Sequence, residues 1–205
     1  MATSATENSE SRYRYDDLIT FCESLYTARG MRQDIAAISA CILVEADLLG
    51  HSTHGMALLA GYLGALADGQ MLAAGEPVIE NERTVVQAWH GQRLSGLWLT
   101  DKAIRTATAM AKAHGTGIIS IKHSHHIACL AAYLEAPARE GFIVMLQSSD
   151  PCTASVAPHG GITPIMTPNP IAMGIPTGGD PIMIDISSSI TANGPSMRLM
   201  KEGKR

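Results

Sequence analysis

Aromatic residues, charged residues and basic tracts are scarce in this 205-residue chain, and their scarcity excludes one large class of function. Aromatic residues make up 4% of the sequence and charged residues 17%, and the net charge is −4 with a pI near 6.0. A nucleic-acid-binding protein typically carries a basic stripe with interleaved aromatic residues. The longest basic tract is the closing stretch 201–205 (KEGKR). We therefore expect no nucleic-acid partner.

Signals for metal knuckles, export and membrane insertion are also lacking. The four cysteines include no CxxC pair, so neither a zinc knuckle nor a redox dithiol is indicated. Residues 1–11 are polar and unlike a signal peptide. The longest apolar run, 35–44, is too short to span a bilayer. We expect a cytoplasmic protein with no membrane contact, in a reducing compartment.

Apolar periodicity divides the chain into three parts. Residues 1–12 read as a disordered leader. In 13–75, apolar residues at helical spacing predict one helix that Gly30 stops, and a second from 33 to 49 with Gly50 as its C-cap. A third helix is predicted from an N-cap at Thr53 to Asp68.

The pattern changes after residue 75, where helices alternate with apolar strands that we expect to be buried. Helices are predicted at 100–114, which Gly115 closes, and at 127–140; strands are predicted at 78–79, 84–89, 117–122, 142–147, 171–175 and 181–186. Such alternation is typical of an α/β domain. Residues 196–204 begin like a helix and stop, so we expect the domain over 76–205 to be incomplete at its C-terminus.

A cluster of three histidines, His123, His125 and His126, follows the predicted strand 117–122 and precedes a predicted helix. Functional groups concentrate at that position in α/β sheets. Histidine exchanges a proton near neutral pH, and a helix start offers free N–H groups that hold an anion. The alternative is a solvated turn with one core histidine.

Further polar clusters could join this one in a ligand site. Thr53-His54 places a hydroxyl beside a histidine, although Thr53 could simply cap a helix. The segment 147–151 (QSSDP) follows a predicted strand, the prolines of 167–170 (TPNP) pre-position the amide of Asn169, and 185–189 (DISSS) ends another strand. Each is weak alone, but together they follow the ends of successive strands, as a ligand crevice requires. Glu45 and Asp47 read as solvated or helix-pairing carboxylates.

One apparent dinucleotide fingerprint is rejected. Residues 115–120 (GTGIIS) resemble a glycine-rich phosphate loop that lacks its last glycine. That loop works between a strand and the following helix, whereas the order here is helix then strand.

Taken in order, the motifs resemble the malate/L-lactate dehydrogenase family of the non-Rossmann type, which includes ureidoglycolate, sulfolactate and piperideine-2-carboxylate relatives. The resemblance is carried by 45–50 (EADLLG), 53–55 (THG), 124–128 (SHHIA) with Tyr133, 157–161 (APHGG), 169–172 (NPIA) and 185–189. It implies a helical N-terminal segment for substrate or dimer contacts and a nicotinamide-binding α/β domain with a mixed sheet. It also implies a homodimer, and a chain shortened at the C-terminus.

The resemblance further implies roles for single residues. The catalytic candidates are His126 and His54, with Thr53 beside it. Residues implied to contact NAD or NADP are His126, Ile127, Ala128, Cys129, Leu130, Ser149, Asn169, Asp185, Ile186 and Ser187. Residues implied to lie near the substrate are Asp150, Thr167 and Pro168. No metal ligand is expected.

The chain departs from the family pattern where the substrate is held. Leu58 stands where the family commonly places an arginine, whose bidentate bond to a carboxylate leucine cannot make. Thr53 replaces a serine but keeps the hydroxyl, and Thr167-Pro168 replaces Gly-Thr.

The expected reaction is hydride transfer between NAD(P)H and a small 2-oxo or 2-hydroxy acid, or a cyclic imino acid. A histidine near neutral pH can supply or remove the accompanying proton, and both His126 and His54 are candidates. Two alternatives stay open: a non-catalytic relative acting as a binding or subunit chain, and a metal-dependent hydrolase using the histidines.

Overall fold

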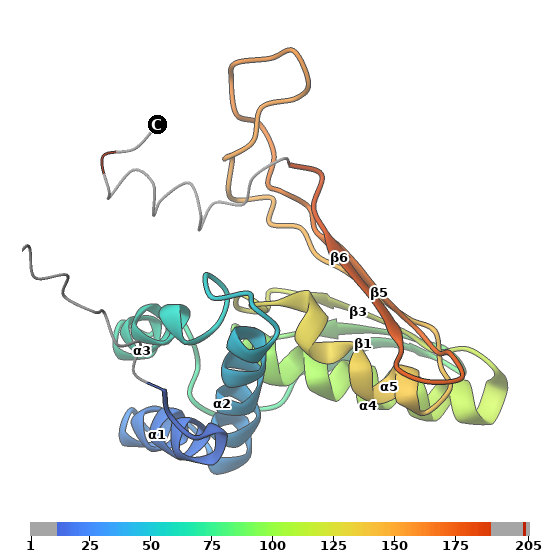
Figure 1. Cartoon of the computed structure of the whole chain (residues 1–205), viewed down its shortest axis with the longest axis horizontal. Coiled ribbons are helices and arrows are strands. Elements are labelled where there is room, and N and C mark those ends of the chain that lie inside the picture. Colours follow the sequence, from blue (N-terminus) through green and yellow to red (C-terminus); the bar gives the residue numbers. More distant parts are fainter. Residues whose placement is uncertain (1–11, 190–202, 204–205) are drawn as a thin grey trace, which may run out of the picture.

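Three helices pack together at one end of the computed structural model, which describes residues 12–189 and residue 203 (Figure 1). They are α1 (Tyr15–Ala28), α2 (Gln33–Leu48) and α3 (Leu59–Ala67), the last preceded by the 3-10 helix η1 (Met56–Leu58). Gly30 and Gly50 follow the first two helices with φ of 79° and 85°, a conformation that favours glycine, so the predicted stops are confirmed. None of the described helices has the length and apolar character to cross a bilayer.

A β-α-β unit forms the first sheet. It comprises β1 (Val78–Arg83), β2 (Val86–His90), α4 (Gly96–His114) and β3 (Ile118–Lys122). β1 pairs antiparallel with β2, and β2 pairs parallel with β3 through the α4 crossover, so the sheet is mixed as predicted. Gly115 ends α4 at φ 87° and donates its N–H to the carbonyl oxygen of Ala111, as a C-terminal glycine should.

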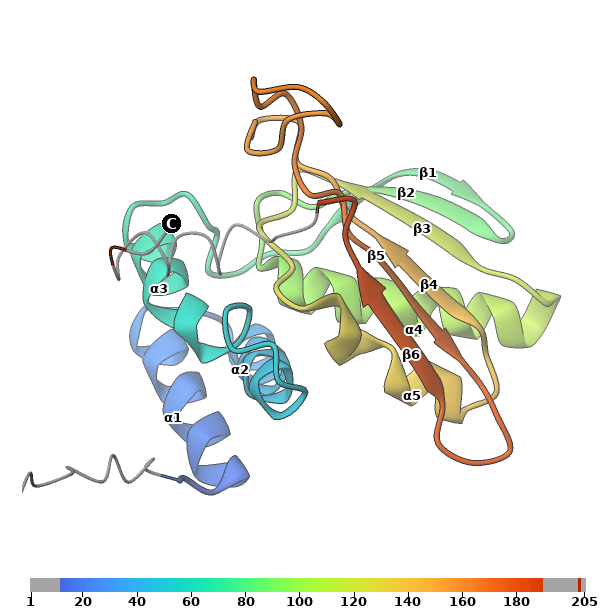
Figure 2. The same ribbon diagram turned by 45° about the horizontal axis from the view of Figure 1, so that its top comes forward.

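The second sheet is antiparallel and separate from the first (Figure 2). It contains β4 (Val144–Gln147), β5 (Ile171–Ile175) and β6 (Ile182–Ile186). Gln147 pairs with Ile171, which pairs with Ile186 on its other side. The end of β4, the start of β5 and the end of β6 therefore lie at one edge, and the connection 148–170 extends away from it in both views.

The helix predicted at 127–140 is wrong. The chain has no regular secondary structure over 124–129, then forms the 3-10 helix η2 (Leu130–Tyr133) and the short α5 (Glu135–Arg139). Ala128 has a φ of 57°, outside the right-handed helical region. Pro137 lacks the N–H that a helix through Tyr133 would need at that position.

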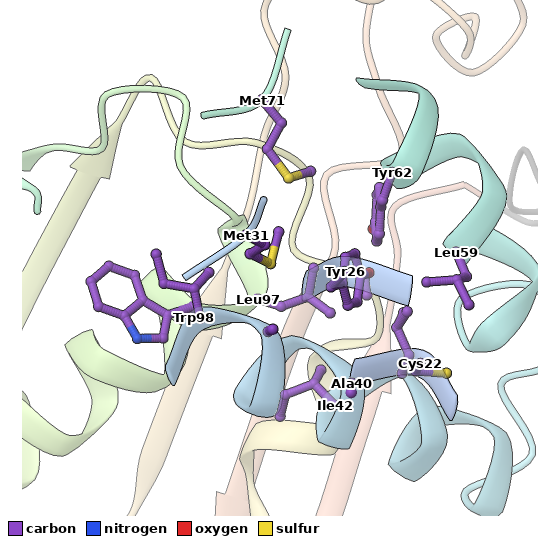
Figure 3. Packing of buried hydrophobic residues seen from close by; sticks show 14 of the residues in the cluster. Cys22, Tyr26, Met31, Ala40, Ile42, Leu59, Tyr62, Met71, Leu97 and Trp98 are labelled. Carbon is purple, nitrogen blue, oxygen red and sulfur yellow. The ribbon is translucent and has the colours of Figure 1, made fainter. Parts of the chain in front are cut away.

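The main core joins the helical segment to the α/β part. Tyr26 and Ile35 from α1 and α2 pack in one cluster with Leu94, Leu97 and Trp98 around the start of α4 (Figure 3). The ring of Tyr62 from α3 reaches the same cluster and is 4% exposed. This shared packing holds α3 against the segment that follows β3.

The strands predicted to be buried are packed on one face only. In β3, Ile121 packs against the core whereas Ile118 is 54% exposed. In β4, Leu146 packs inward whereas Met145 is 54% exposed. Alternation along a strand sends every second side chain to the face that no described element covers. The predicted leader and the helix start at 196–204 lie outside the described residues, except for 12 and 203.

Candidate active site

The polar clusters that follow the strands of the second sheet lie side by side. Ser148 donates its N–H to the carbonyl oxygen of Pro170 over 3.2 Å, and Ser188 donates its N–H to that of Pro168 over 2.8 Å. These bonds join 148–150, 167–170 and 187–189 at the edge where β4 ends and β5 begins. The polar segments that were expected from the sequence to lie together at the strand ends therefore do so.

The histidine segment 123–126 continues the ladder of β3 rather than starting a helix. Arg93 donates its N–H to the carbonyl oxygen of His123 over 2.7 Å, and His125 donates its N–H to that of Leu94 over 3.1 Å. A Cβ on Gly96 would overlap the carbonyl oxygens of His125 and His126. The predicted anion site at a helix start is thus absent from this segment, because its backbone is bonded to 91–94.

His54 lies in a loop that Asp47 anchors. The Asp47 carboxylate accepts the Met56 N–H over 2.8 Å, and a Cβ on Gly55 would overlap the same carboxylate. The prediction that Asp47 is a solvated carboxylate is therefore wrong. Thr53 does not cap a helix either, since its hydroxyl lies 3.0 Å from Nδ1 of His54.

His54, His126 and Tyr62 meet although they are far apart in the sequence. The rings of His54 and His126 are stacked, with centroids 6.1 Å apart. The Tyr62 hydroxyl lies 2.6 Å from Nδ1 of His126, and the Tyr62 ring meets that of His125 edge-on at 5.5 Å. The sequence interpretation missed Tyr62, because a tyrosine on the apolar face of a helix looks like ordinary core. His123 instead stacks on His90, 4.7 Å away.

The electrostatics of the cluster favour neutral imidazoles. Burial lowers the pKa of His126, and the nearby His54 and His125 lower it further, while the Asp150 charge opposes them. His126 keeps solvent-exposed surface, which limits this downward shift. Burial and the neighbouring His51 also lower the pKa of His54, against the charge of Asp185. Asp150 and Asp185 thus act on the two histidines from the second sheet.

Asp185 on β6 is already committed to the protein. Its Oδ2 accepts the Ala131 N–H over 2.8 Å and the Cys129 thiol over 3.8 Å, and burial raises the pKa of that thiol to about 11. His51 brings a third ligand atom within 4.8 Å, which makes this a metal-capable group in the described part of the chain. The thiol and the carboxylate are each other's partners, so the cluster is satisfied without an ion. Within residues 12–189, the histidines of 123–126 join no such group.

The remaining predicted site residues form a hydrogen-bonded network or pack inward. The hydroxyls of Ser149 and Thr167 both donate to Oδ1 of Asn169 over 2.8 Å. Asp150 accepts the Cys152 N–H, and its hydrogen bond from the Thr153 hydroxyl lowers its pKa. The other predicted positions are placed as follows: the Ile127 carbonyl accepts the Tyr133 hydroxyl, Leu130 is buried, Ile186 is exposed, the Ser187 hydroxyl donates to the Ser189 carbonyl, and Leu58 packs against the core.

A surface groove of about 500 Å³ lies elsewhere, between α4 and α5. Ile42, Ile104 and Pro137 line it, together with charged residues of α4 and Glu140. Those charges pair with one another, Arg105 with Asp101 and Lys112 with Glu140. None of the predicted site residues lines this groove, so we place the candidate site at the paired histidines.

Comparisons with known proteins place the chain in a family of dehydrogenases. The sequence model of a family described as malate/L-lactate dehydrogenase matches residues 13–205. The chain is 31% identical to a (2R)-3-sulfolactate dehydrogenase (NADP(+)) from Chromohalobacter salexigens, over 90% of the chain and 55% of that protein. It is 29% identical to a Δ1-pyrroline-2-carboxylate/Δ1-piperideine-2-carboxylate reductase from Pseudomonas syringae pv. tomato, over 100% of the chain and 59% of that protein.

A solved structure has the same fold. The crystal structure of malate dehydrogenase from Entamoeba histolytica superposes with a TM-score of 0.89 at 26% identity, covering 95% of this chain and 54% of that one. The chain spans about half the length of the proteins it matches.

Proposed function

Because the chain belongs to the malate/L-lactate dehydrogenase family, we propose that it carries the proton-exchange centre of an NAD(P)-dependent oxidoreductase. The substrate class is a small 2-oxo or 2-hydroxy acid, with cyclic imino acids as the related alternative. The observation that carries the proposal is the pairing of His54 with His126, whose titration the charges of Asp150 and Asp185 influence.

The proton chemistry follows from the histidines. Reduction of a 2-oxo acid leaves an oxygen that must take a proton, and oxidation of the hydroxy acid requires that proton to be removed. A neutral imidazole can remove the hydroxyl proton during oxidation, and the imidazolium returns it during reduction. His54 and His126 are the two candidates, since both rings are kept neutral near pH 7 by burial.

The donor set fits the nicotinamide end of the cofactor. The carboxamide and ribose are uncharged hydrogen-bonding groups, which neutral imidazoles and the hydroxyls of Ser149 and Ser187 complement. Asp150 and Asp185 would repel a pyrophosphate, and no site residue named here is lysine or arginine. We therefore assign the nicotinamide, rather than the phosphates, to the region of His126–Leu130 and Asp185–Ser187. When bound, the cofactor supplies the hydride.

We propose NAD or NADP as cofactor and a cytoplasmic homodimer. We also propose that segment 13–75 makes the dimer or substrate contacts and that segment 76–205 binds cofactor. Support for the dimer comes from the helical segment, where Phe21 is 54% exposed and Leu48 is 66% exposed. Light scattering of the purified chain tests the assembly.

The test of the proposed function is a nicotinamide fluorescence titration of the 205-residue chain with NADH and with NADPH. We expect saturable binding of at least one, weakened by His126→Ala and unchanged by His123→Ala, whose side chain stacks on His90 instead. A panel of 2-oxo acids and cyclic imines then identifies the substrate. If neither nucleotide binds, the chain is not the cofactor-binding unit and the subunit alternative gains support.

A further inference from the structure

Tyr62 makes a buried contact with the candidate centre from outside every predicted motif. It stands on α3, 64 positions before His126, and its hydroxyl lies 2.6 Å from Nδ1 of that histidine. Its ring is fixed by the core and by the edge-on contact with His125. The hydroxyl is therefore held in place before any ligand arrives.

The same nitrogen of His126 also receives a backbone group. The Ala128 N–H points at Nδ1 over 3.3 Å. A backbone N–H can only donate, so Nδ1 must offer its lone pair and the proton of the neutral ring must sit on Nε2. Ala128 is buried and adopts a φ of 57°, a conformation that alanine rarely takes, in the turn that delivers this bond. The Tyr62 hydroxyl, which can donate or accept, then donates to the same nitrogen.

We infer that Tyr62 is a positioning residue that, together with the Ala128 N–H, fixes His126 in the Nε2–H tautomer. The inference deepens the proposed function and rests on it for the consequence that follows. A neutral Nε2–H ring donates a hydrogen bond to the substrate oxygen or carboxamide. It has no free lone pair at Nε2 with which to remove a proton.

The proton-exchanging role then falls to His54. Its Nδ1 faces the Thr53 hydroxyl at 3.0 Å, which can donate to the neutral ring or accept from the imidazolium. During oxidation the substrate hydroxyl proton would pass to His54, and during reduction it would return to the substrate oxygen, with the bound cofactor taking up or supplying the hydride. The titratable groups facing His126 are His54, His125, Tyr62 and Asp150, and those facing His54 are His51, His126 and Asp185. The Thr53–His54 pair leaves both protonation states of His54 bonded.

The test is imidazole NMR on the ¹⁵N-histidine-labelled chain, which reports the tautomer without any turnover. His126→Gln assigns the His126 signals. We expect two-bond proton–nitrogen correlations that show a protonated Nε2 and a bare Nδ1 from about pH 6 to about pH 8. In Tyr62→Phe, which keeps the ring but loses the hydroxyl, we expect exchange between both tautomers.

Tyr26→Phe is the matched control, because Tyr26 is equally buried and its hydroxyl has no hydrogen-bond partner among the described residues. It should leave the His126 signals unchanged, and circular dichroism of each variant reports the fold. An Nδ1–H tautomer in the wild type, or an unaltered tautomer in Tyr62→Phe, overturns the inference. Failure of the nucleotide titration would leave the tautomer result standing, so the two proposals fail separately.

Discussion

The two sides of the candidate site are built in different ways. His54, Tyr62 and His126 are held by core packing, by backbone bonds and by glycines that leave no room for a Cβ. Ser149 and Asn169 lie on the other side, in a connection where hydroxyl and amide groups mainly bond one another. Packing of the first kind fixes geometry to within small displacements, whereas a surface hydrogen-bond network can rearrange at low cost. We therefore expect the first side to set the reaction and the second to adapt to the ligand.

The sharpest way to break the packed side is Gly96→Val. Its Cβ would overlap the carbonyl oxygens of His125 and His126, which are backbone atoms and cannot rotate away. We expect a loss of about 3 kcal/mol or more in the free energy of unfolding, measured by urea denaturation. Gly178→Val is the control, because nothing lies within 4 Å of the side chain it would add. A Gly96→Val chain as stable as the control would refute the packed arrangement.

The lowered pKa values of the clustered histidines predict a pH dependence of stability. Burial lowers the pKa of His54, His125 and His126, so below about pH 6.5 the unfolded chain binds more protons than the folded chain. Their stabilising effect is complete above that pH and is lost as the pH falls. We expect the free energy of unfolding to decrease from about pH 7 to about pH 5, and less steeply in His126→Gln.

Asp150→Asn should not flatten the slope over that range, because it removes a charge that raises the pKa of His126. Hydrogen bonds from Thr153 and Cys152 lower the pKa of the Asp150 carboxyl, which therefore titrates below this range. Equal slopes in wild type and His126→Gln would contradict the assignment of a lowered pKa to His126.

Asp47→Ala tests the anchor of the His54 loop. It removes the acceptor of the Met56 N–H and leaves space beside Gly55. We expect a loss of about 1–2 kcal/mol in the free energy of unfolding and a weaker His54–His126 contact in the NMR spectrum. Glu45→Ala is the control, because the Glu45 carboxylate accepts no hydrogen bond within residues 12–189. It should cost less than about 0.5 kcal/mol.

Ser149→Ala should produce the smallest change. Its hydroxyl is exposed, and Asn169 keeps its second donor, Thr167. We expect a loss of about 0.5 kcal/mol or less in thermal or urea unfolding, because water replaces the exposed hydrogen bond. A loss as large as that of Asp47→Ala would mean that the two sides do not differ in rigidity.

Local sequence signals predicted the elements better than the contacts between them. Gly30, Gly50 and Gly115 mark helix ends because their left-handed conformations leave a direct trace in the sequence. The apolar runs located the strands to within a few residues, and their polar ends meet as expected. These features depend on near neighbours in the chain.

The wrong or missed predictions concern features that depend on tertiary packing. The helix predicted from 127 failed because the Tyr133 hydroxyl takes the Ile127 carbonyl and Ala128 lies outside the right-handed helical region at a φ of 57°. Tyr62 and Asp47 were missed because a core-like tyrosine and a helix-end carboxylate gain their roles only when distant segments meet. No pattern of residue spacing in the sequence predicts that Tyr62 contacts His126.

The central claim is that the packed side carries the proton chemistry, and turnover of a 2-oxo acid with NADH or NADPH tests it most directly. We expect His54→Ala to lower kcat/KM by roughly 10²–10⁴-fold, the range of a lost general acid–base, and Ser149→Ala to change it less than about threefold. Normal turnover in both His54→Ala and His126→Ala would contradict the account.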